Sequence, residues 1–253
     1  MIYDLQKASM WKRISAFLFD VILMSMLAVL LALILSAVTG YDSHYTVFRS
    51  AYDRYYEEYG LTDAILTADP ASLTAEETER VNAASAALAK DTEAVHAYNM
   101  VINLQLLIVT FALLLGFLVL EFIVPLLLGN GQTLGKKIFG VAVMHVEGIR
   151  ISHVALFIRT ILGKYAVETM PYAMCAMYIV SGLGSPVFLL IGGALLIVQA
   201  VLLIFSHENA MLHDKMAMTV TVDLASQMIF STREELLEYK KKLHAEKAAA
   251  QAY

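Results

Sequence analysis

Long apolar segments recur along the chain, and their lengths predict membrane-spanning helices. Residues 14–38, 101–128 and 186–205 each form an apolar run long enough to cross a bilayer, which requires about 20 predominantly apolar residues. A weaker run covers residues 166–183 and has Pro171 near its start. The pattern therefore predicts an all-α membrane protein with four transmembrane helices.

A polar segment, residues 39–100, separates the first two apolar runs and predicts an external helical hairpin. Its first helix carries aromatic side chains along one side, namely Tyr45, Phe48, Tyr52, Tyr55, Tyr56 and Tyr59. Thr74 and Glu77 form a capping box, the S/T-x-x-E pattern that begins a helix, and an alanine-rich stretch follows. No helix breaker precedes residue 101, so we expect the second helix to continue into the second span as one rod.

The segment after the second span, residues 129–165, combines a basic loop with a β-pattern. The stretch KIFGVAVMHVEGIRIS alternates and has a turn pair at Glu147-Gly148, which predicts a small cytoplasmic β-hairpin. The stretch MTVTVD, residues 218–223, is a candidate third strand for the same sheet.

Two further helices are predicted outside the spans. The stretch SHVALFIRTILGKY places apolar residues at helical spacing beside Arg159 and Lys164, which favours an interfacial helix before the third span. The C-terminal region, residues 206–253, contains STREELLEYKKKLHAEKAAA, in which Ser231 and Glu234 form a second capping box. We expect a highly charged, solvated helix there.

The composition agrees with a membrane protein and excludes several other classes. Of the 253 residues, 59% are hydrophobic and only 16% are charged, whereas soluble domains average about 25% charged residues. The single cysteine, Cys175, excludes an intramolecular disulfide framework and a cysteine-based zinc site. The first apolar run is longer than the roughly 7–15-residue core of a signal peptide, so we expect it to remain as a span.

Basic residues lie before the first span, after the second and after the fourth, and by the positive-inside rule they orient the chain. Both termini and residues 129–165 are thus expected in the cytoplasm, with residues 39–100 outside. The external segment has eleven acids against four bases, a net charge of −7. The expected partner is the lipid bilayer, and no nucleic acid is expected. The orienting bases are Lys7, Lys12, Arg13, Lys136, Lys137, Arg150, Lys215, Arg233, Lys240, Lys241 and Lys242.

Two carboxylates interrupt the apolar runs at the same expected depth. Asp20 lies six residues inside the first span and Glu121 seven residues before the inner end of the second, so each is about 9–10 Å from the cytoplasmic boundary. A charge there costs roughly 2.5–3.5 kcal/mol on insertion scales. The two acids could hold a cation or share a proton, or each could neutralise a base such as Arg159 or Lys164 and fix helix packing. We expect Asp20 to turn inward, toward one of these bases or toward Glu121.

Other polar motifs indicate chemistry only weakly. His213, Asp214 and Lys215 follow the fourth span, but no second histidine lies at ligand spacing, so no metal site is predicted. The stretch GNGQTLGKK does not match the spacing of the phosphate-binding loop and indicates a basic loop near anionic lipid. No nucleophile and base stand at catalytic spacing, so we expect neither an enzyme nor a cofactor.

Three of these segments resemble the motifs of one family, in the same order. WKRISAFLFD, GQTLGKKIFGVAV and LHDKMAMTVTV are similar to the opening, loop and closing motifs of the RDD family of bacterial multi-span membrane proteins, named for one arginine and two aspartates. By this resemblance, Arg13, Asp20 and Asp214 are the signature positions. The loop motif comprises Gln132, Thr133, Gly135, Lys136 and Lys137. Two positions depart from the family pattern, because Ala142 replaces a basic residue and Met218 replaces a glycine.

The resemblance implies a multi-pass protein of a bacterial plasma membrane and little settled function. Some relatives are proposed to exchange Na⁺ or other monovalent cations for H⁺, and that role would make Asp20, Glu121 and Asp214 the ion- or proton-handling residues. The charge partners in that role would be Arg13, Arg159, Lys164 and Lys215. A homo-oligomer would be expected, because four spans make a thin wall around a pathway. Two alternatives stay open: a non-transporting scaffold whose external hairpin binds an envelope partner, or a site between the spans for lipid or a small solute.

Overall fold

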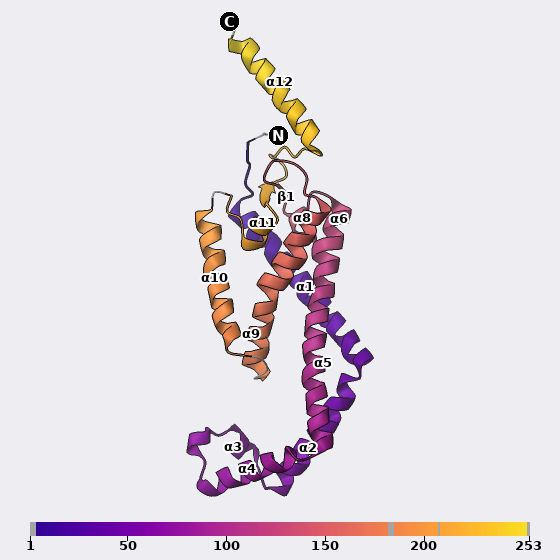
Figure 1. The fold of residues 1–253 in the computed structure, drawn as a ribbon, viewed down its shortest axis with the longest axis vertical. Helices are drawn as coiled ribbons and strands as arrows, with labels where there is room; N and C mark the ends of the chain where they lie inside the picture. Colours follow the sequence, from indigo (N-terminus) through magenta and orange to yellow (C-terminus); the bar gives the residue numbers. More distant parts are fainter. Residues whose placement is uncertain (1–3, 182–184, 207, 252–253) are drawn as a thin grey trace. The chain divides into compact units, whose positions relative to one another are not determined.

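The computed structural model is mostly helical, with one small sheet (Figure 1). It describes residues 4–181, 185–206 and 208–251. The chain divides into two compact units, which are described separately. Unit 1 comprises Met1–Val29 and Ala112–Tyr253, and unit 2 comprises Leu30–Phe111.

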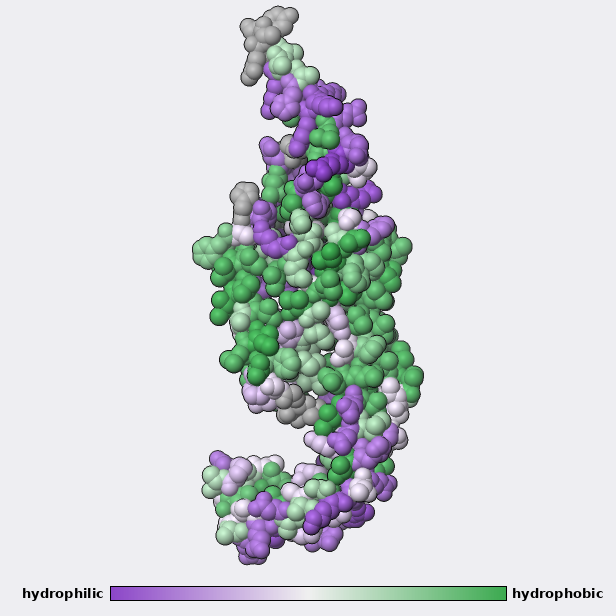
Figure 2. Space-filling view, viewed as in Figure 1, coloured by the Kyte–Doolittle hydropathy of each residue, from purple (hydrophilic) through white to green (hydrophobic). Residues whose placement is uncertain are grey.

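Three helices of the described residues are long and apolar enough to cross a membrane. They are α1 (Met10–Thr39), the helix Thr92–Leu128, and α10 (Val187–Phe205). The second of these is made of α5 (Thr92–Phe117), the π-helical segment η2 (Leu118–Ile123) and α6 (Val124–Leu128). Figure 2 shows hydrophobic residues gathered over the surfaces of α10 and α6, as expected for faces that contact lipid.

The segment before α10 forms one helix where the sequence predicted two. α8 (His153–Phe157), the π-helical segment η3 (Ile158–Thr169) and α9 (Met170–Ser181) follow one another without interruption. The predicted boundary between an interfacial helix and a third span is therefore wrong, and Pro171 lies inside the helix. Arg159, which made its first half look interfacial, is buried beside an acid. The last two residues of the predicted third span, 182 and 183, lie outside the described residues.

The antiparallel sheet of unit 1 is formed by other segments than the two arms of the predicted hairpin. Its two strands are β1 (Val141–His145) and β2 (Thr219–Asp223). The predicted turn at Glu147-Gly148 is present, but within the described residues its returning arm makes only isolated bridges. The candidate third strand is thus the partner of β1. Burial explains this outcome, since the apolar side chains of β1 and β2 are buried together, whereas Arg150 on the returning arm is exposed.

Short helices and the C-terminal helix complete unit 1. They are α7 (Leu134–Ile138), α11 (Leu212–Met216) and α12 (Arg233–Gln251). The predicted C-terminal helix is present, but the capping pair of Ser231 with Glu234 is wrong by one residue. The Glu235 N–H donates to Thr232 Oγ1 (3.2 Å), and the Ser231 N–H donates to Glu235 Oε2 (2.7 Å). Thr232 therefore caps α12.

Unit 2 contains the predicted helical hairpin. Its elements are α2 (Tyr41–Glu58), α3 (Asp63–Thr67), the 3-10 turn η1 (Pro70–Ser72), α4 (Ala75–Leu88) and the first part of α5. The capping box of Thr74 with Glu77 is confirmed. The aromatic side of α2 packs partly on itself, with the ring centroids of Tyr52 and Tyr56 3.7 Å apart. Small side chains allow the close approach of helices within the hairpin, and Ala51 is buried there.

The predicted continuous rod from the alanine-rich helix into the second span is wrong. α4 ends at Leu88 and α5 begins at Thr92, because Asp91 begins a new helix. The Asp91 Oδ1 accepts hydrogen bonds from the N–H groups of Glu93 (3.1 Å) and Ala94 (3.0 Å). A carboxylate that accepts from these first free N–H groups stabilises a helix start, so an aspartate can divide two helices without glycine or proline.

Candidate functional site

A cavity of about 460 Å³ lies within unit 1, where α1 meets α5, η2, η3, α7 and α11. Much of its wall is apolar, with side chains that include Ile14, Phe17, Val21, Met24, Leu113 and Phe117. Ionisable side chains from five elements line the same cavity: Arg13, Asp20, Glu121, Lys136, Arg159, Lys164, Glu168, His213 and Asp214. The volume falls in the range of small-molecule sites, about 300–1,000 Å³.

Asp20 binds the first turn of α7. Its Oδ2 accepts a hydrogen bond from the Thr133 hydroxyl (2.5 Å), and its Oδ1 accepts one from the Gly135 N–H (2.8 Å). The Lys136 ammonium lies 4.0 Å from Oδ2. Thr133 also caps α7, since its Oγ1 accepts from the Lys136 N–H (3.3 Å). The sequence predicted that Asp20 turns toward Arg159, Lys164 or Glu121. Neither of these two bases holds the acid, which instead accepts its hydrogen bonds from the loop motif.

Close approach of backbones explains the glycine in that loop motif. A Cβ atom on Gly135 would lie 2.4 Å from the Ala16 carbonyl oxygen and 2.9 Å from Asp20 Oδ1. Both distances are shorter than van der Waals contact, so only glycine lets α7 reach α1. The neighbouring Gln132 is also buried, and its amide donates to the Val141 carbonyl (2.7 Å), which ties the loop to β1.

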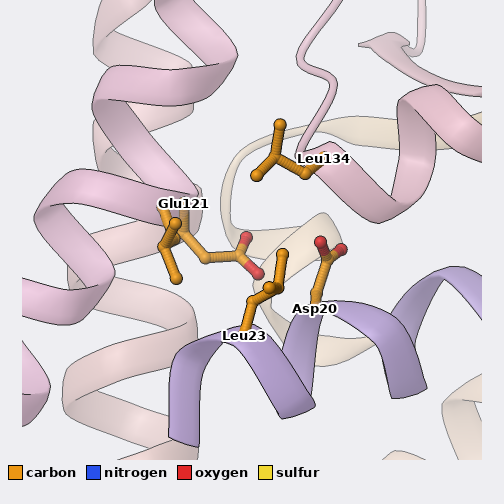
Figure 3. A pocket seen from close by; sticks show the side chains of 5 residues that line it. Asp20, Leu23, Glu121 and Leu134 are labelled. Carbon is orange, nitrogen blue, oxygen red and sulfur yellow. The ribbon is translucent and has the colours of Figure 1, made fainter. Parts of the chain in front are cut away.

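Glu121 pairs with Lys164. The Lys164 Nζ donates to Glu121 Oε2 at 2.7 Å, and the Glu121 residue is only 6% exposed. Figure 3 shows the Glu121 carboxylate directed toward Asp20 across a small pocket, while the Asp20 carboxylate is directed toward the segment that carries Leu134. Leu23 also lines this pocket. The two acids that the sequence placed at one depth thus line one pocket, and each also has its own donor.

Arg159 and Asp214 form the most buried ion pair of the site. The Arg159 Nε donates to Asp214 Oδ1 at 2.8 Å, and the two residues are 2% and 1% exposed. The Thr219 hydroxyl at the start of β2 donates to the same oxygen (3.1 Å). Burial alone would raise the pKa of Asp214, but the Arg159 guanidinium outweighs it and holds that pKa well below the usual range. Asp214 is therefore a carboxylate at neutral pH.

His213 extends this pair to Glu168. His213 Nδ1 lies 2.8 Å from Glu168 Oε2, and the His213 N–H donates to Oε1 (2.9 Å). His213 Nε2 faces Arg159 Nη2 at 3.2 Å. Burial lowers the pKa of His213, against the opposing effects of Asp214 and Glu168. A neutral ring with its proton on Nδ1 satisfies both contacts, because Nδ1–H donates to Glu168 while Nε2 accepts from Arg159.

Lys136 is a buried base in the lining of the same cavity. It is 8% exposed, and its ammonium donates to Thr133 Oγ1 (3.2 Å). Burial and the nearby Lys164 lower the pKa of Lys136 to about 7, with Arg159 adding to the effect and Glu121 and Asp20 opposing it. The protonated and the neutral form of Lys136 are therefore both populated near neutral pH.

The structure gathers most of the residues singled out from the sequence but not all of them. Lys137 is exposed, and Lys215 pairs with Glu208 (2.6 Å) outside the cavity lining. Glu168 was missed, although an acid within the predicted third span was the available signal. His213 was considered only as a metal ligand, and its contact with Glu168 depends on the packing of α11 against η3, which no local pattern shows.

We predict that Asp214→Asn lowers the free energy of unfolding by about 3–5 kcal/mol, because it leaves the Arg159 charge buried without its carboxylate. Lys215→Gln is the matched control in the same helix. Its pair with Glu208 is partly exposed to solvent, and surface pairs contribute about 0–1 kcal/mol. Reversible unfolding in detergent micelles, followed by circular dichroism, measures both losses. Losses of equal size would contradict a structural role for the buried pair.

We also predict that the free energy of unfolding of the wild type rises as the pH increases above 7, and that Lys136→Met removes this rise. Folding lowers the pKa of Lys136 from 10.5 to about 7, so between these values the unfolded chain binds a proton that the folded chain lacks. Stability then increases with pH across that window, and below it both states are protonated and the dependence ends. Denaturant unfolding of wild type and variant at pH values on both sides of neutrality gives the difference. A difference that stays constant with pH would refute the lowered pKa.

Comparison with known proteins agrees with the sequence motifs. The family model described as RDD family matches residues 7–218, a range that includes Arg13, Asp20 and Asp214. Comparison with curated proteins and with solved structures found no match. Because the match covers most of the chain and the structure has helices apolar enough to span a membrane, this protein belongs to the RDD family.

Proposed function

We propose that this RDD protein crosses the membrane four times and binds an amphiphilic solute or lipid in the cavity of unit 1. The continuous helix from His153 to Ser181 supplies the fourth crossing in addition to α1, α5 with α6, and α10. It has 29 residues, which at about 1.5 Å per residue gives roughly 43 Å, enough for a bilayer. The basic residues beside the predicted spans support a cytoplasmic location for both termini in a bacterial plasma membrane.

The observation that carries the binding proposal is the mixed lining of one cavity. One wall offers apolar side chains from α1 and α5, and charged side chains gather in the same space. An amphiphile has an apolar part and a polar head, and such a cavity can accept both at once. A purely structural cluster of charges would instead favour close packing, because protein interiors leave few voids larger than a water molecule.

A cavity-filling substitution tests this proposal. Val21→Trp places a large ring in the cavity, whereas Ile22→Trp changes the next residue, which is 59% exposed and does not line the cavity. Delipidated protein is mixed with dioctanoyl phosphatidic acid or dioctanoylglycerol, and native mass spectrometry counts the bound molecules. We expect wild type and Ile22→Trp to retain one probe molecule, and Val21→Trp to bind it about tenfold more weakly, or 1.4 kcal/mol. Equal binding by both tryptophan variants would contradict the proposal.

Exchange of a monovalent cation for a proton is the second candidate. It is favoured by Asp20 and Glu121, which face the same pocket (Figure 3). Two carboxylates in one pocket can bind a cation or share a proton, provided that their present donors withdraw. In proteoliposomes, wild type should then exchange Na⁺ for H⁺, Asp20→Asn should abolish the flux, and Glu208→Gln should preserve it. Flux that is unchanged in folded Asp20→Asn protein would end this candidate.

A further inference from the structure

We infer that the head group of the bound amphiphile is an anion, with the oxygens of a phosphate or a carboxylate, and that Arg13 binds it. This rests on the proposed amphiphile site and adds the chemical class of its ligand. Two observations support it: the state of pairing among the charges of the cavity, and the position of Arg13 relative to the apolar wall.

The acids that line the cavity already accept hydrogen bonds from the chain. Glu121 is paired with Lys164, Asp214 with Arg159, Glu168 with His213, and Asp20 with Thr133 and Gly135. An acid whose oxygens are held by donors has little remaining capacity for a cation, and separating a buried pair is costly. The paired state of the cavity therefore disfavours a cationic ligand.

Arg13, in contrast to these acids, has a polar atom that is not paired within the described residues. Its Nη1 is buried and has no hydrogen-bond partner in the described part of the chain. The other three bases of the cavity, Lys136, Arg159 and Lys164, each donate to a neighbouring side chain. Leaving a buried donor without an acceptor costs free energy, more so when the donor is charged. An anionic oxygen at Nη1 would satisfy it with a charge-assisted hydrogen bond.

The apolar wall begins next to Arg13. Phe17, Val21 and Met24 follow it on α1 at steps of four, four and three residues, and all four side chains line the cavity. Residues at this spacing share one helix face. Arg13 and Met24 are eleven residues apart, about 16 Å along the helix axis. A molecule with its head at Arg13 would thus lay an apolar chain along Phe17, Val21 and Met24.

The same anionic chemistry could come from a lipid or from a soluble phosphate, and the probes distinguish these sources. Dioctanoyl phosphatidic acid and dioctanoylglycerol carry the same two chains and differ in the phosphate, while inorganic phosphate has no chain. Binding to full-length wild type in detergent is measured by native mass spectrometry for the amphiphiles and by calorimetry for all three. We expect phosphatidic acid to bind about tenfold more tightly than dioctanoylglycerol, equivalent to 1.4 kcal/mol, and phosphate alone to bind more weakly than either amphiphile.

Variants of Arg13 then assign the preference to one side chain. Arg13→Gln should bind the two amphiphiles equally, and Arg13→Lys should restore part of the preference, since an ammonium keeps the charge but lacks the planar fork of guanidinium. Lys12→Gln is the matched control. It removes a positive charge from the adjacent residue, which does not line the cavity and pairs with Asp223 (2.5 Å). That variant should keep the wild-type preference.

The outcomes separate this inference from the function on which it rests. If wild type binds neither amphiphile, the proposed function fails. If wild type binds both equally, the amphiphile site stands and the anionic head group is refuted. If the preference persists in Arg13→Gln, Arg13 is not the residue that binds the head group. Phosphate that binds as tightly as phosphatidic acid would refute the lipid as its source. Should Arg13→Gln fail to fold, the two amphiphiles compared on wild type and on Arg13→Lys still decide the matter.

Discussion

The buried pair of Arg159 and Asp214 is the contact on which the arrangement of unit 1 depends. A guanidinium on η3 and a carboxylate on α11 cannot both leave water unless they meet with hydrogen-bond geometry. Their meeting supplies a carboxylate to the guanidinium that the helix from His153 buries. It also brings His213 onto Glu168 and positions the start of β2, because the Thr219 hydroxyl donates to Asp214. The contacts of Asp214 and its neighbour His213 thus join the sheet, α11 and η3.

The second polar contact of this kind is that of Asp20, which joins α1 to α7. We call this contact and the pair of Arg159 with Asp214 the two anchors of unit 1. Asp20 satisfies two donors of the first turn of α7, and α7 leads directly into β1. β1 pairs with β2, so the two anchors meet through the sheet. A polar group inside a membrane protein must have its hydrogen bonds supplied by the protein itself, and both anchors follow this rule. The space between them remains as the cavity, lined on one side by the apolar face of α1.

The predicted third span is not among the helices of the described residues that are apolar enough to cross a membrane. The sequence does predict the other three apolar helices, the acidic hairpin with its Thr74 capping box, the loop motif and two acids that line one pocket, Asp20 and Glu121. These features depend on local composition and helix rise, which a single chain displays. The partner of β1, the donors of Asp20 and the contact of His213 with Glu168 depend on segments 78, 113 and 45 residues away. The prediction of a continuous rod failed at Asp91 for a different reason. An aspartate in the sequence does not by itself indicate a helix start, and here it does so only because its Oδ1 accepts from the N–H groups of Glu93 and Ala94. Long-range pairing and side-chain capping therefore account for the errors.

The state of the charges bears on the choice between an anionic amphiphile and a cation. To free the Asp20 carboxylate, α7 must withdraw the Thr133 hydroxyl and the Gly135 N–H, and each buried group left unpaired costs about 1–3 kcal/mol. To free the Glu121 carboxylate, Lys164 would likewise have to withdraw its ammonium group. An anion that approaches Arg13 breaks none of these contacts, because Nη1 has no partner in the described chain to give up. Cation exchange thus requires a second conformation in which α7 has moved, whereas an anion at Arg13 requires no donor or acceptor of the cavity to leave its present partner.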